Sequence, residues 1–339
     1  MASMTAMNEQ NIPYIATNGN IMGTPGSVAR TLLVNNMDFN SLRRIQTNGG
    51  IMPYESNWTH YDDLIIPAAL PVLNVFGDLD EAGLVRRTGN PRQRKTEWVT
   101  SGDRAMANVG MEVDAQIDRD LLNFETQELP LPFIANGFSL TLREIGDLGN
   151  GIAIDTLNAE DAARRVAFRV EDMCVNGYPH KIQGKIIPGI RTFPGNTPIN
   201  FSTPINAEHA PDMMNCLIDE MENREFFDAP TNLYLPTGMS SILNQIVPDT
   251  NGRLLREHLE MMTGITKIKT TSRMPKGEMA LVRMSADTID VLQTQDMITV
   301  EWDSRGGLVF DFMVLTILVP RVKARQDGKV GIVHATFKI

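Results

Sequence analysis

One segment, Asn158 to Gly177 (NAEDAARRVAFRVEDMCVNG), constrains the fold more than any other because it carries a complete set of helix signals. Asn158 can cap the free amides of the first turn, and Gly177 suits a left-handed residue after the last turn. Small and apolar residues recur at helical spacing on one face: Ala159, Ala162, Ala163, Val166, Ala167, Val170 and Cys174. Charged residues occupy the rest: Arg164, Arg165, Arg169, Glu171 and Asp172. The segment predicts a long helix over residues 159–176 that buries Val166, Val170 and Cys174 against a sheet or another helix.

The composition is typical of a globular protein. Of the 339 residues, 42% are hydrophobic, which is enough for the core of one large domain or two ordinary ones. The longest apolar run, LVFDFMVLTILVP from Leu308 to Pro320, is too short for a bilayer, contains Asp311 and ends in a proline. This run predicts a buried strand, and we expect no membrane contact.

The N-terminal residues and the cysteines indicate the compartment. The opening residues, MASMTAMNEQNIPY, lack the basic residues and the apolar block of a signal peptide. The chain has only two cysteines, Cys174 and Cys216, so a disulfide framework is not expected. We therefore expect an intracellular protein with reduced thiols.

Charge is distributed unevenly along the chain. A net charge of −10 argues against a protein whose main task is binding nucleic acid, because that affinity comes largely from lysine and arginine. One basic run contains no acidic residue: Arg86, Arg87, Arg92, Arg94 and Lys95. An acidic run follows, opposed only by Arg119: Glu112, Asp114, Asp118, Asp120, Glu125 and Glu128. Runs of this kind most often form a solvated surface, although a local patch can still bind a partner.

The first half of the chain divides into segments of different character. Residues 1–55 are rich in Asn, Gly, Thr and Met without a sustained period, which predicts an extended arm. Packing begins in residues 56–87. Residues 88–130 are polar, and the strand-like pieces KTEWVT and NVGMEV flank the turn candidate SGDR, which predicts a long hairpin with little core of its own. The alternation in FSLTLREI, residues 138–145, predicts a half-buried strand that leads into the long helix.

The second half alternates between helical and strand patterns. The segment APDMMNCLIDEMENREFF predicts a second helix, because Pro211 suits its first turn and apolar residues recur after it. GMSSILNQIV and NGRLLREHLEMM also fit helices. Strands are predicted for TNLYLPTG, GEMALVRMS, DMITVEW and the apolar run from Leu308. The fold class is therefore α+β.

The residue patterns that enzymes use are missing from the sequence. It contains no phosphate-binding GxxxxGK[ST], no GxGxxG after a strand, no HExxH and no CxxC. The five histidines are scattered without the spacing of metal ligands: His60, His180, His209, His258 and His334. Ser240 and Ser241 suit a helix start, and Cys174 and Cys216 lie on or near apolar stripes, where a thiol behaves as a small hydrophobe. We expect no cofactor, no metal and no catalytic residue.

Two windows of the sequence resemble the encapsulin shell proteins and the major capsid proteins of tailed phages with the Hong Kong 97-like fold. In the first, Leu129 to Phe193, a strand ends in LTLREI, a long helix ends in EDMCVNG, and the glycine-rich GKIIPGI follows. The second is the C-terminal stretch LVFDFMVLTILVPRVKARQDGKVGIVHATFKI. Together the resemblance extends over residues 62–339 and rests on the order of these patterns.

The resemblance implies a domain organisation. The expected parts are an N-terminal arm (1–55), the start of the peripheral (P) domain (56–87), an extended hairpin or E-loop (88–130), the P domain with its spine helix (131–200), the axial (A) domain (201–305) and the closing strands (306–339). In the family the E-loop reaches over a neighbour, which makes the two charged runs candidates for contacts between subunits. These candidates are Arg86, Arg87, Arg92, Arg94, Lys95, Glu112, Asp114, Asp118 and Asp120.

The resemblance also implies a function. The first hypothesis is a major capsid protein of a tailed bacteriophage that assembles, as hexamers and pentamers, into an icosahedral shell around double-stranded DNA without sequence-specific contact. Such a protein assembles in the bacterial cytoplasm and resides in the virion, and any scaffolding, portal or decoration protein is a separate chain. The second hypothesis is an encapsulin-type cellular nanocompartment that encloses cargo enzymes, and the third is an α+β enzyme. Lys95, the one lysine between Pro53 and Pro179, lies near the hairpin base, so we expect no covalent cross-link.

Overall fold

The computed structural model describes residues 14–15, 21–22, 67–101, 124–141, 156–224, 226, 229–248, 252–262, 264–305, 309–325 and 328–338. Residues 14–15 and 21–22 form a short antiparallel pair, β1 (Tyr14–Ile15) and β2 (Ile21–Met22). Most of the expected N-terminal arm, residues 1–55, lies outside the described residues.

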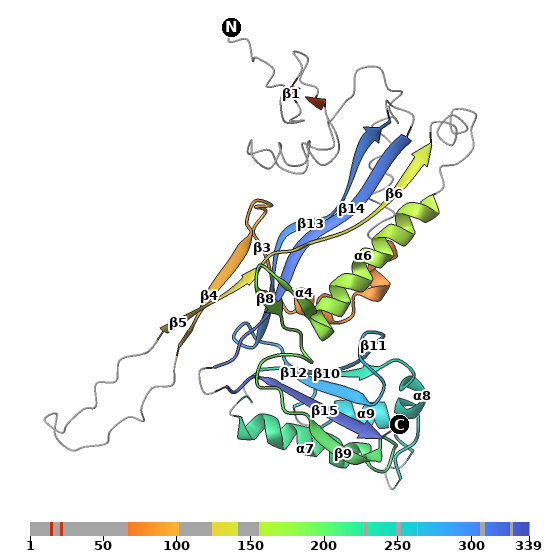
Figure 1. The fold of residues 1–339 in the computed structure, drawn as a ribbon. Helices are drawn as coiled ribbons and strands as arrows, with labels where there is room; N and C mark the ends of the chain where they lie inside the picture. Colours follow the sequence, from red (N-terminus) through yellow and green to blue (C-terminus); the bar gives the residue numbers. More distant parts are fainter. Residues whose placement is uncertain are drawn as a thin grey trace, which may run out of the picture.

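A four-stranded sheet forms the upper part of the subunit, in the order β3-β13-β14-β6 (Figure 1). Its strands are β3 (Val85–Arg87), β13 (Ile289–Ser304), β14 (Val309–Val322) and β6 (Phe133–Thr141). β14 is antiparallel to both β13 and β6, and the short β3 is parallel to β13. The apolar run from Leu308 thus forms a buried central strand, as its composition predicts.

The long helix α6 (Thr156–Asn176) packs along β6 and β14 (Figure 1). Alanine and valine on its inner face share one core with Ile134 of β6 and Val314 of β14. The helix ends where the sequence predicts, because Gly177 has a φ of 70° that suits glycine. It begins three residues earlier than expected, at Thr156, so Asn158 lies inside the first turn and is not the cap.

A two-stranded hairpin leaves the body of the subunit on the side away from α6 (Figure 1). Its strands are β4 (Lys95–Ser101) and β5 (Phe124–Pro130), which pair from Lys95 with Pro130 to Ser101 with Phe124. The sequence predicted this hairpin but with the wrong partner for KTEWVT. Its partner is the later segment FETQELP, and NVGMEV lies outside the described residues.

A five-stranded sheet forms the lower part, in the order β11-β10-β12-β15-β9 (Figure 1). Its strands are β11 (Lys267–Thr271), β10 (Thr231–Pro236), β12 (Glu278–Arg283), β15 (Ile332–Lys338) and β9 (Ile199–Pro204). Its helices are α7 (Ala210–Asn223), α8 (Ser240–Leu243) and α9 (Leu255–Glu260). Alternate residues along the strands enter two cores: Leu233 and Leu281 join these helices, whereas Tyr234 and Ala280 join the core of α6. The two halves of the subunit therefore share one core at their junction.

Two assignments from the sequence need correction. Residues 201–305 were expected to form one axial domain, but β13 is hydrogen-bonded to β14 and belongs to the four-stranded sheet. Its apolar pattern is that of any buried strand, so the pattern alone does not identify the sheet that the strand joins. Cys216 was placed near the apolar stripe of its helix, yet it is exposed on α7.

Smaller elements fill the junction between the sheets. A 3-10 turn, η1 (Leu70–Val72), and helix α4 (Val75–Glu81) pack against α6. Asp78 of α4 accepts a hydrogen bond from the Tyr234 hydroxyl of β10 at 3.0 Å, so this helix also contacts the five-stranded sheet. After α6 the chain forms a second hairpin, β7 (Tyr178–Ile182) and β8 (Lys185–Ile187).

Candidate assembly interface

The base of the β4–β5 hairpin is held by a buried ion pair. Asp290 of β13 and Arg321 of β14 are directly opposite each other in the sheet. The Arg321 Nε and Nη2 atoms donate to the two carboxylate oxygens of Asp290 at 2.8 and 2.5 Å. Both residues are buried, and a bidentate pair of this kind offsets the cost of removing the two charges from water.

The same arginine contacts the hairpin. Its Nη1 donates to the hydroxyl of Thr96 at 2.9 Å, and its guanidinium lies 5.8 Å from the ring centre of Trp98. Thr96 and Trp98 both belong to β4, on the strand face that turns toward the sheet. Arg321 therefore ties the first hairpin strand to the body of the subunit.

Positive charge is in excess at this hairpin base. Besides Arg321, the ammonium of Lys323 lies 2.9 Å and the guanidinium of Arg86 lies 3.5 Å from the same Asp290 carboxylate. Burial lowers the pKa of Lys323, and the charges of Arg321 and Arg86 act in the same direction. Three cations thus surround one carboxylate. The side chain of Arg86 is 61% exposed, so part of this charge faces the surface.

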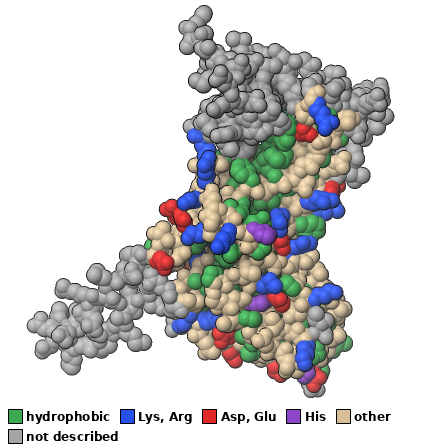
Figure 2. All heavy atoms as spheres, viewed as in Figure 1, with side chains coloured by type: hydrophobic (Ala, Val, Ile, Leu, Met, Phe, Trp, Pro, Cys, Tyr) green, Lys and Arg blue, Asp and Glu red, His purple; other side chains and the backbone are tan. Residues whose placement is uncertain are grey.

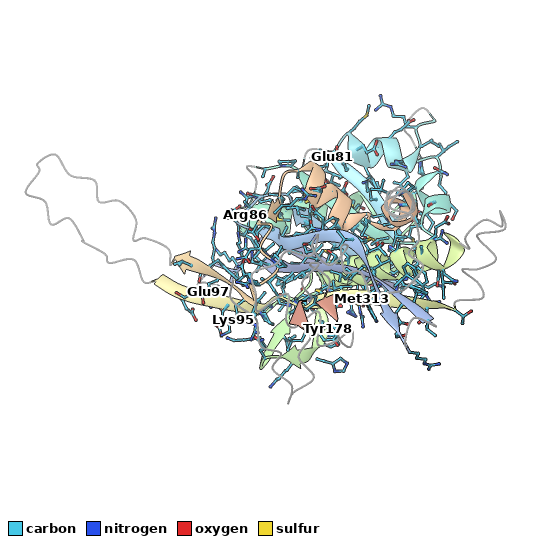
Figure 3. The ribbon with its side chains drawn as sticks, turned by 90° about the horizontal axis from the view of Figure 1, so that it is seen from above. Glu81, Arg86, Lys95, Glu97, Tyr178 and Met313 are labelled. Carbon is cyan, nitrogen blue, oxygen red and sulfur yellow. The ribbon has the colours of Figure 1, made fainter. Side chains whose placement is uncertain are left out.

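The other predicted basic residues lie around this base, and two of them pair within the chain. Arg87 binds Asp80 at 2.8 Å and Asp296 at 3.3 Å, and Lys95 binds Glu128 at 3.2 Å across the hairpin. Figure 3 shows Lys95 and Glu97 at the root of the hairpin, with Arg86 nearby. Arg94 is exposed, and Arg92 is partly buried beside it.

The predicted acidic partners are only partly visible. Glu128 and Glu125 lie on β5, whereas the other four lie outside the described residues: Glu112, Asp114, Asp118 and Asp120. The structure therefore locates the basic half of the two charged runs. Their contact with a second subunit stays a prediction.

The predicted core residues of the long helix lie in the shared core. Val166, Val170 and Cys174 are all buried against the sheets. Glu171 is buried with them, although the sequence placed it on the charged face. Its position four residues after Ala167 and three before Cys174 was the available signal, because residues at those spacings share a helix face.

An open groove of about 330 Å³ lies between α6, β6 and β7. Its apolar lining includes Ile134, Val166 and Met173, and Phe133 beside them is 53% exposed. Arg165 and Arg169 contribute the positive charge of the lining. On the face shown in Figure 2, hydrophobic side chains gather over the upper part of the subunit, where the four-stranded sheet lies.

The described residues offer no evident centre for chemistry. No group of three His, Cys, Asp or Glu side chains suited to a metal ion occurs among them. None of the helices in the described ranges has the length and apolar character needed to span a bilayer. Sequence reasoning missed the polar residues that join elements in the interior. Four of them are buried, namely Glu171, Asp290, Arg321 and His334, and Lys323 is partly buried.

Comparison with known proteins points to one family. A family model described as "Encapsulating protein for peroxidase" (Linocin_M18) matches residues 105–317, which is more than half of the chain. No curated protein matches the chain.

Several solved structures share the fold. A virus-like particle from Pyrococcus furiosus aligns with a TM-score of 0.60 at 15% identity, covering 82% of this chain and 99% of that one. The capsid of Myoviridae phage XM1 aligns with a TM-score of 0.57 at 10% identity, covering 76% and 90%. The capsid of a native GTA particle aligns with a TM-score of 0.56 at 12% identity, covering 87% and 95%. The α+β fold is therefore the Hong Kong 97-like capsid fold.

Proposed function

Because the chain belongs to the family of encapsulating proteins for peroxidase, we propose that it is a structural subunit that self-assembles into a closed shell and has no catalytic residue. The observation that carries this proposal is the β4–β5 hairpin. An isolated two-stranded hairpin is marginally stable in water, so one that leaves the body of the subunit needs a second surface for support. In a closed assembly each neighbour supplies that surface, and the contact recurs around the symmetry axes.

The first candidate is the major capsid protein of a tailed bacteriophage, built into hexamers and pentamers around packaged double-stranded DNA. The resemblance of the fold to the phage XM1 capsid supports it. A net charge of −10 suits a shell that encloses DNA without binding it tightly, because the 41 acidic residues outnumber the 31 basic ones. The shell would assemble in the bacterial cytoplasm and form the virion capsid, with separate scaffolding, portal or decoration proteins.

The second candidate is a cellular nanocompartment that encloses cargo enzymes. The description of the matching family model supports it, as does the likeness to the Pyrococcus furiosus particle. The two candidates share the shell and differ in its contents.

Electron microscopy of the purified full-length protein tests the shell. We expect closed icosahedral particles, whereas a protein that stays monomeric at high concentration would contradict the proposal. A variant in which residues 102–123 are replaced by a short turn is the matched control, and it should fold but not close shells. Particles purified from the native source then separate the two candidates: nuclease-protected DNA supports the phage capsid, and a co-purified enzyme supports the nanocompartment.

A further inference from the structure

The loop of residues 188–198 connects β8 to β9 of the five-stranded sheet and lies against the end of α6. The backbone amide of Ile190 donates to the carbonyl of Cys174, and that of Arg191 to Val175, both at 2.9 Å. These bonds fix residues 189–196 to the last turn of α6. The loop also contacts the sheet through side chains, so it clamps the two halves of the subunit together.

His334 is the contact on the sheet side. It lies on β15 with only 6% of its side chain exposed. One ring nitrogen, Nε2, lies 2.9 Å from a carboxylate oxygen of Glu278 on β12, and the other, Nδ1, lies 3.0 Å from the amide nitrogen of Asn196 in the loop. The same Glu278 oxygen accepts from Arg191 Nε at 2.5 Å. The loop and two strands therefore meet at one imidazole.

The hydrogen bonds define which nitrogen of His334 carries the proton. Asn196 Nδ2 also donates to the backbone carbonyl of Arg191, so the amide cannot turn over without placing two oxygens together. An amide N–H can only donate, and His334 Nδ1 must therefore be an unprotonated acceptor. The neutral ring then carries its proton on Nε2, and this N–H donates a hydrogen bond to Glu278.

Few charges face this ring. Among the described residues, Glu278 from β12 and Arg191 from the loop are the charged groups that act on it, and they form an ion pair with each other. The neighbouring strand β9 brings uncharged residues, pairing Ile199 with Ala335 and Asn200 with Thr336. α6 reaches the cluster through Asn176, whose amide oxygen lies 3.4 Å from Arg191 Nη1. A second proton on His334 would thus add a cation beside Arg191 and point a donor at the Asn196 amide.

We propose that His334 is an acid-sensitive latch, which holds the five-stranded sheet to the loop at the end of α6 while neutral and releases it when protonated. Release would loosen one of the contacts between the two halves of the subunit, while their shared core stays in place.

The direction of the pH effect follows from the surroundings of the ring. Burial lowers the pKa of His334, Arg191 acts in the same direction, and Glu278 opposes both. A histidine whose folded pKa is lowered contributes stability that is complete above its ordinary pKa of about 6.5. That contribution is lost as the pH falls from 6.5 through the lower folded pKa.

Hydrogen exchange of the full-length, unassembled subunit between pH 7.5 and pH 5 tests the latch. After correction for intrinsic exchange, opening of residues 189–196 should increase about tenfold for each pH unit below 6.5 until the folded pKa is reached. His334→Gln, which cannot titrate, should remove this increase, and Asn196→Ala, which removes the opposing donor, should weaken it. His180→Gln changes an exposed histidine on β7 and should behave like the wild type.

Two results would overturn the proposal. One is a wild-type loop whose protection is the same at both pH values, and the other is an undiminished acid response in His334→Gln. If that variant does not fold, titration of the wild-type His334 ring by NMR decides the question, because a folded pKa at or above 6.5 excludes the latch. These measurements use unassembled subunits and do not depend on whether the protein forms shells.

Discussion

The carboxylate of Glu171 accepts a hydrogen bond from the backbone amide of Val75 at 2.9 Å, so a residue in the C-terminal part of α6 caps the start of α4. The same side chain also accepts from the amide of Phe76 at 3.3 Å and from the hydroxyl of Thr271 at the end of β11 at 2.9 Å. Burial raises the pKa of Glu171 despite these hydrogen bonds. One buried carboxylate therefore joins two helices and the five-stranded sheet.

This arrangement predicts opposite outcomes for two substitutions. Glu171→Ala leaves buried donors without an acceptor. It should lower the free energy of unfolding by about 1–3 kcal/mol for each donor that is left unsatisfied. Glu171→Gln keeps one acceptor oxygen and removes the buried charge. Because the pKa of Glu171 is raised in the folded state, the wild type loses stability as the pH rises from the ordinary carboxyl pKa through the folded pKa. Gln does not titrate, so the stability of Glu171→Gln relative to the wild type should increase from acid to neutral pH. Urea unfolding at several pH values measures both, with the exposed Glu222→Gln as the control.

Val170→Asp places a charge in the core between α6 and the sheets. An unpaired buried carboxylate costs several kcal/mol, so we expect the variant to be insoluble or to melt at a much lower temperature. Arg164→Asp puts the same residue on the exposed face of this helix and should change the melting temperature little. A soluble Val170→Asp protein that assembles normally would show that this face of α6 is not in a tight core.

A comparison of Gly177 with Gly184 distinguishes the cost of a left-handed backbone conformation from the cost of steric crowding. Both have positive φ, 70° and 82°, but a Cβ on Gly177 would lie 2.3 Å from the carbonyl oxygen of Ile187, whereas one on Gly184 would meet nothing within 4 Å. Gly184→Ala should therefore cost only the left-handed conformation, about 1–2 kcal/mol. Gly177→Ala should cost clearly more, because two backbone segments must separate. Equal losses of unfolding free energy for the two variants, measured by urea unfolding, would contradict the close packing after α6.

The two cysteines should differ in reactivity. Cys174 is buried, and its burial and the charge of Glu171 raise its pKa well above the ordinary value, which removes the reactive thiolate. Cys216 is exposed on α7. A thiol reagent should label Cys216 promptly in the native subunit and Cys174 only after unfolding, as mass spectrometry of the labelled peptides can show. Prompt labelling of both would mean that the core around α6 opens readily.

The basic hairpin base is expected to meet acidic residues of a neighbouring subunit. Isolated exposed ion pairs contribute only about 0–1 kcal/mol, but complementary patches also select the correct partner and register. Reversing Arg92 and Arg94 to Glu should leave the circular dichroism spectrum unchanged and make assembly fail or depend strongly on salt. Lys276→Glu, an exposed reversal between β11 and β12, is the matched control. Normal particles from the Arg92/Arg94 variant at ordinary salt would show that assembly does not depend on a contact of these two residues with a neighbouring subunit.

Local signals explain what could be predicted from the sequence. Gly177 defines the end of α6, and the run after Leu308 gives a buried strand, because each depends on residues close in the chain. The start of α6 was wrong since Asn158 is a good cap but not an obligatory one. KTEWVT was given a nearby partner because SGDR was taken as the turn of the hairpin, whereas its partner β5 begins only at Phe124.

The buried polar residues depend on contacts between distant segments. Asp290 interrupts an apolar strand, and Arg321 interrupts another, so each could have been flagged as a charge that needs a partner. Their pairing could not be derived, because it depends on the register of β13 and β14. His334 gave no signal at all, since its partners come from a loop and a strand far away in the chain.

The order in which the strands enter the two sheets affects how the subunit can be synthesised. After β6 the chain leaves the four-stranded sheet, builds most of the other sheet, returns for β13 and β14, and leaves again for β15. Phe138 of β6 stacks on Phe312 of β14 at 5.0 Å, although about half the length of the chain separates them. Such long-range pairing is slow, and it cannot start before the later strand exists. A nascent chain would thus carry β4 and β5 before the strand that anchors them exists, and the competence to join neighbours would arrive only after β14 has been translated.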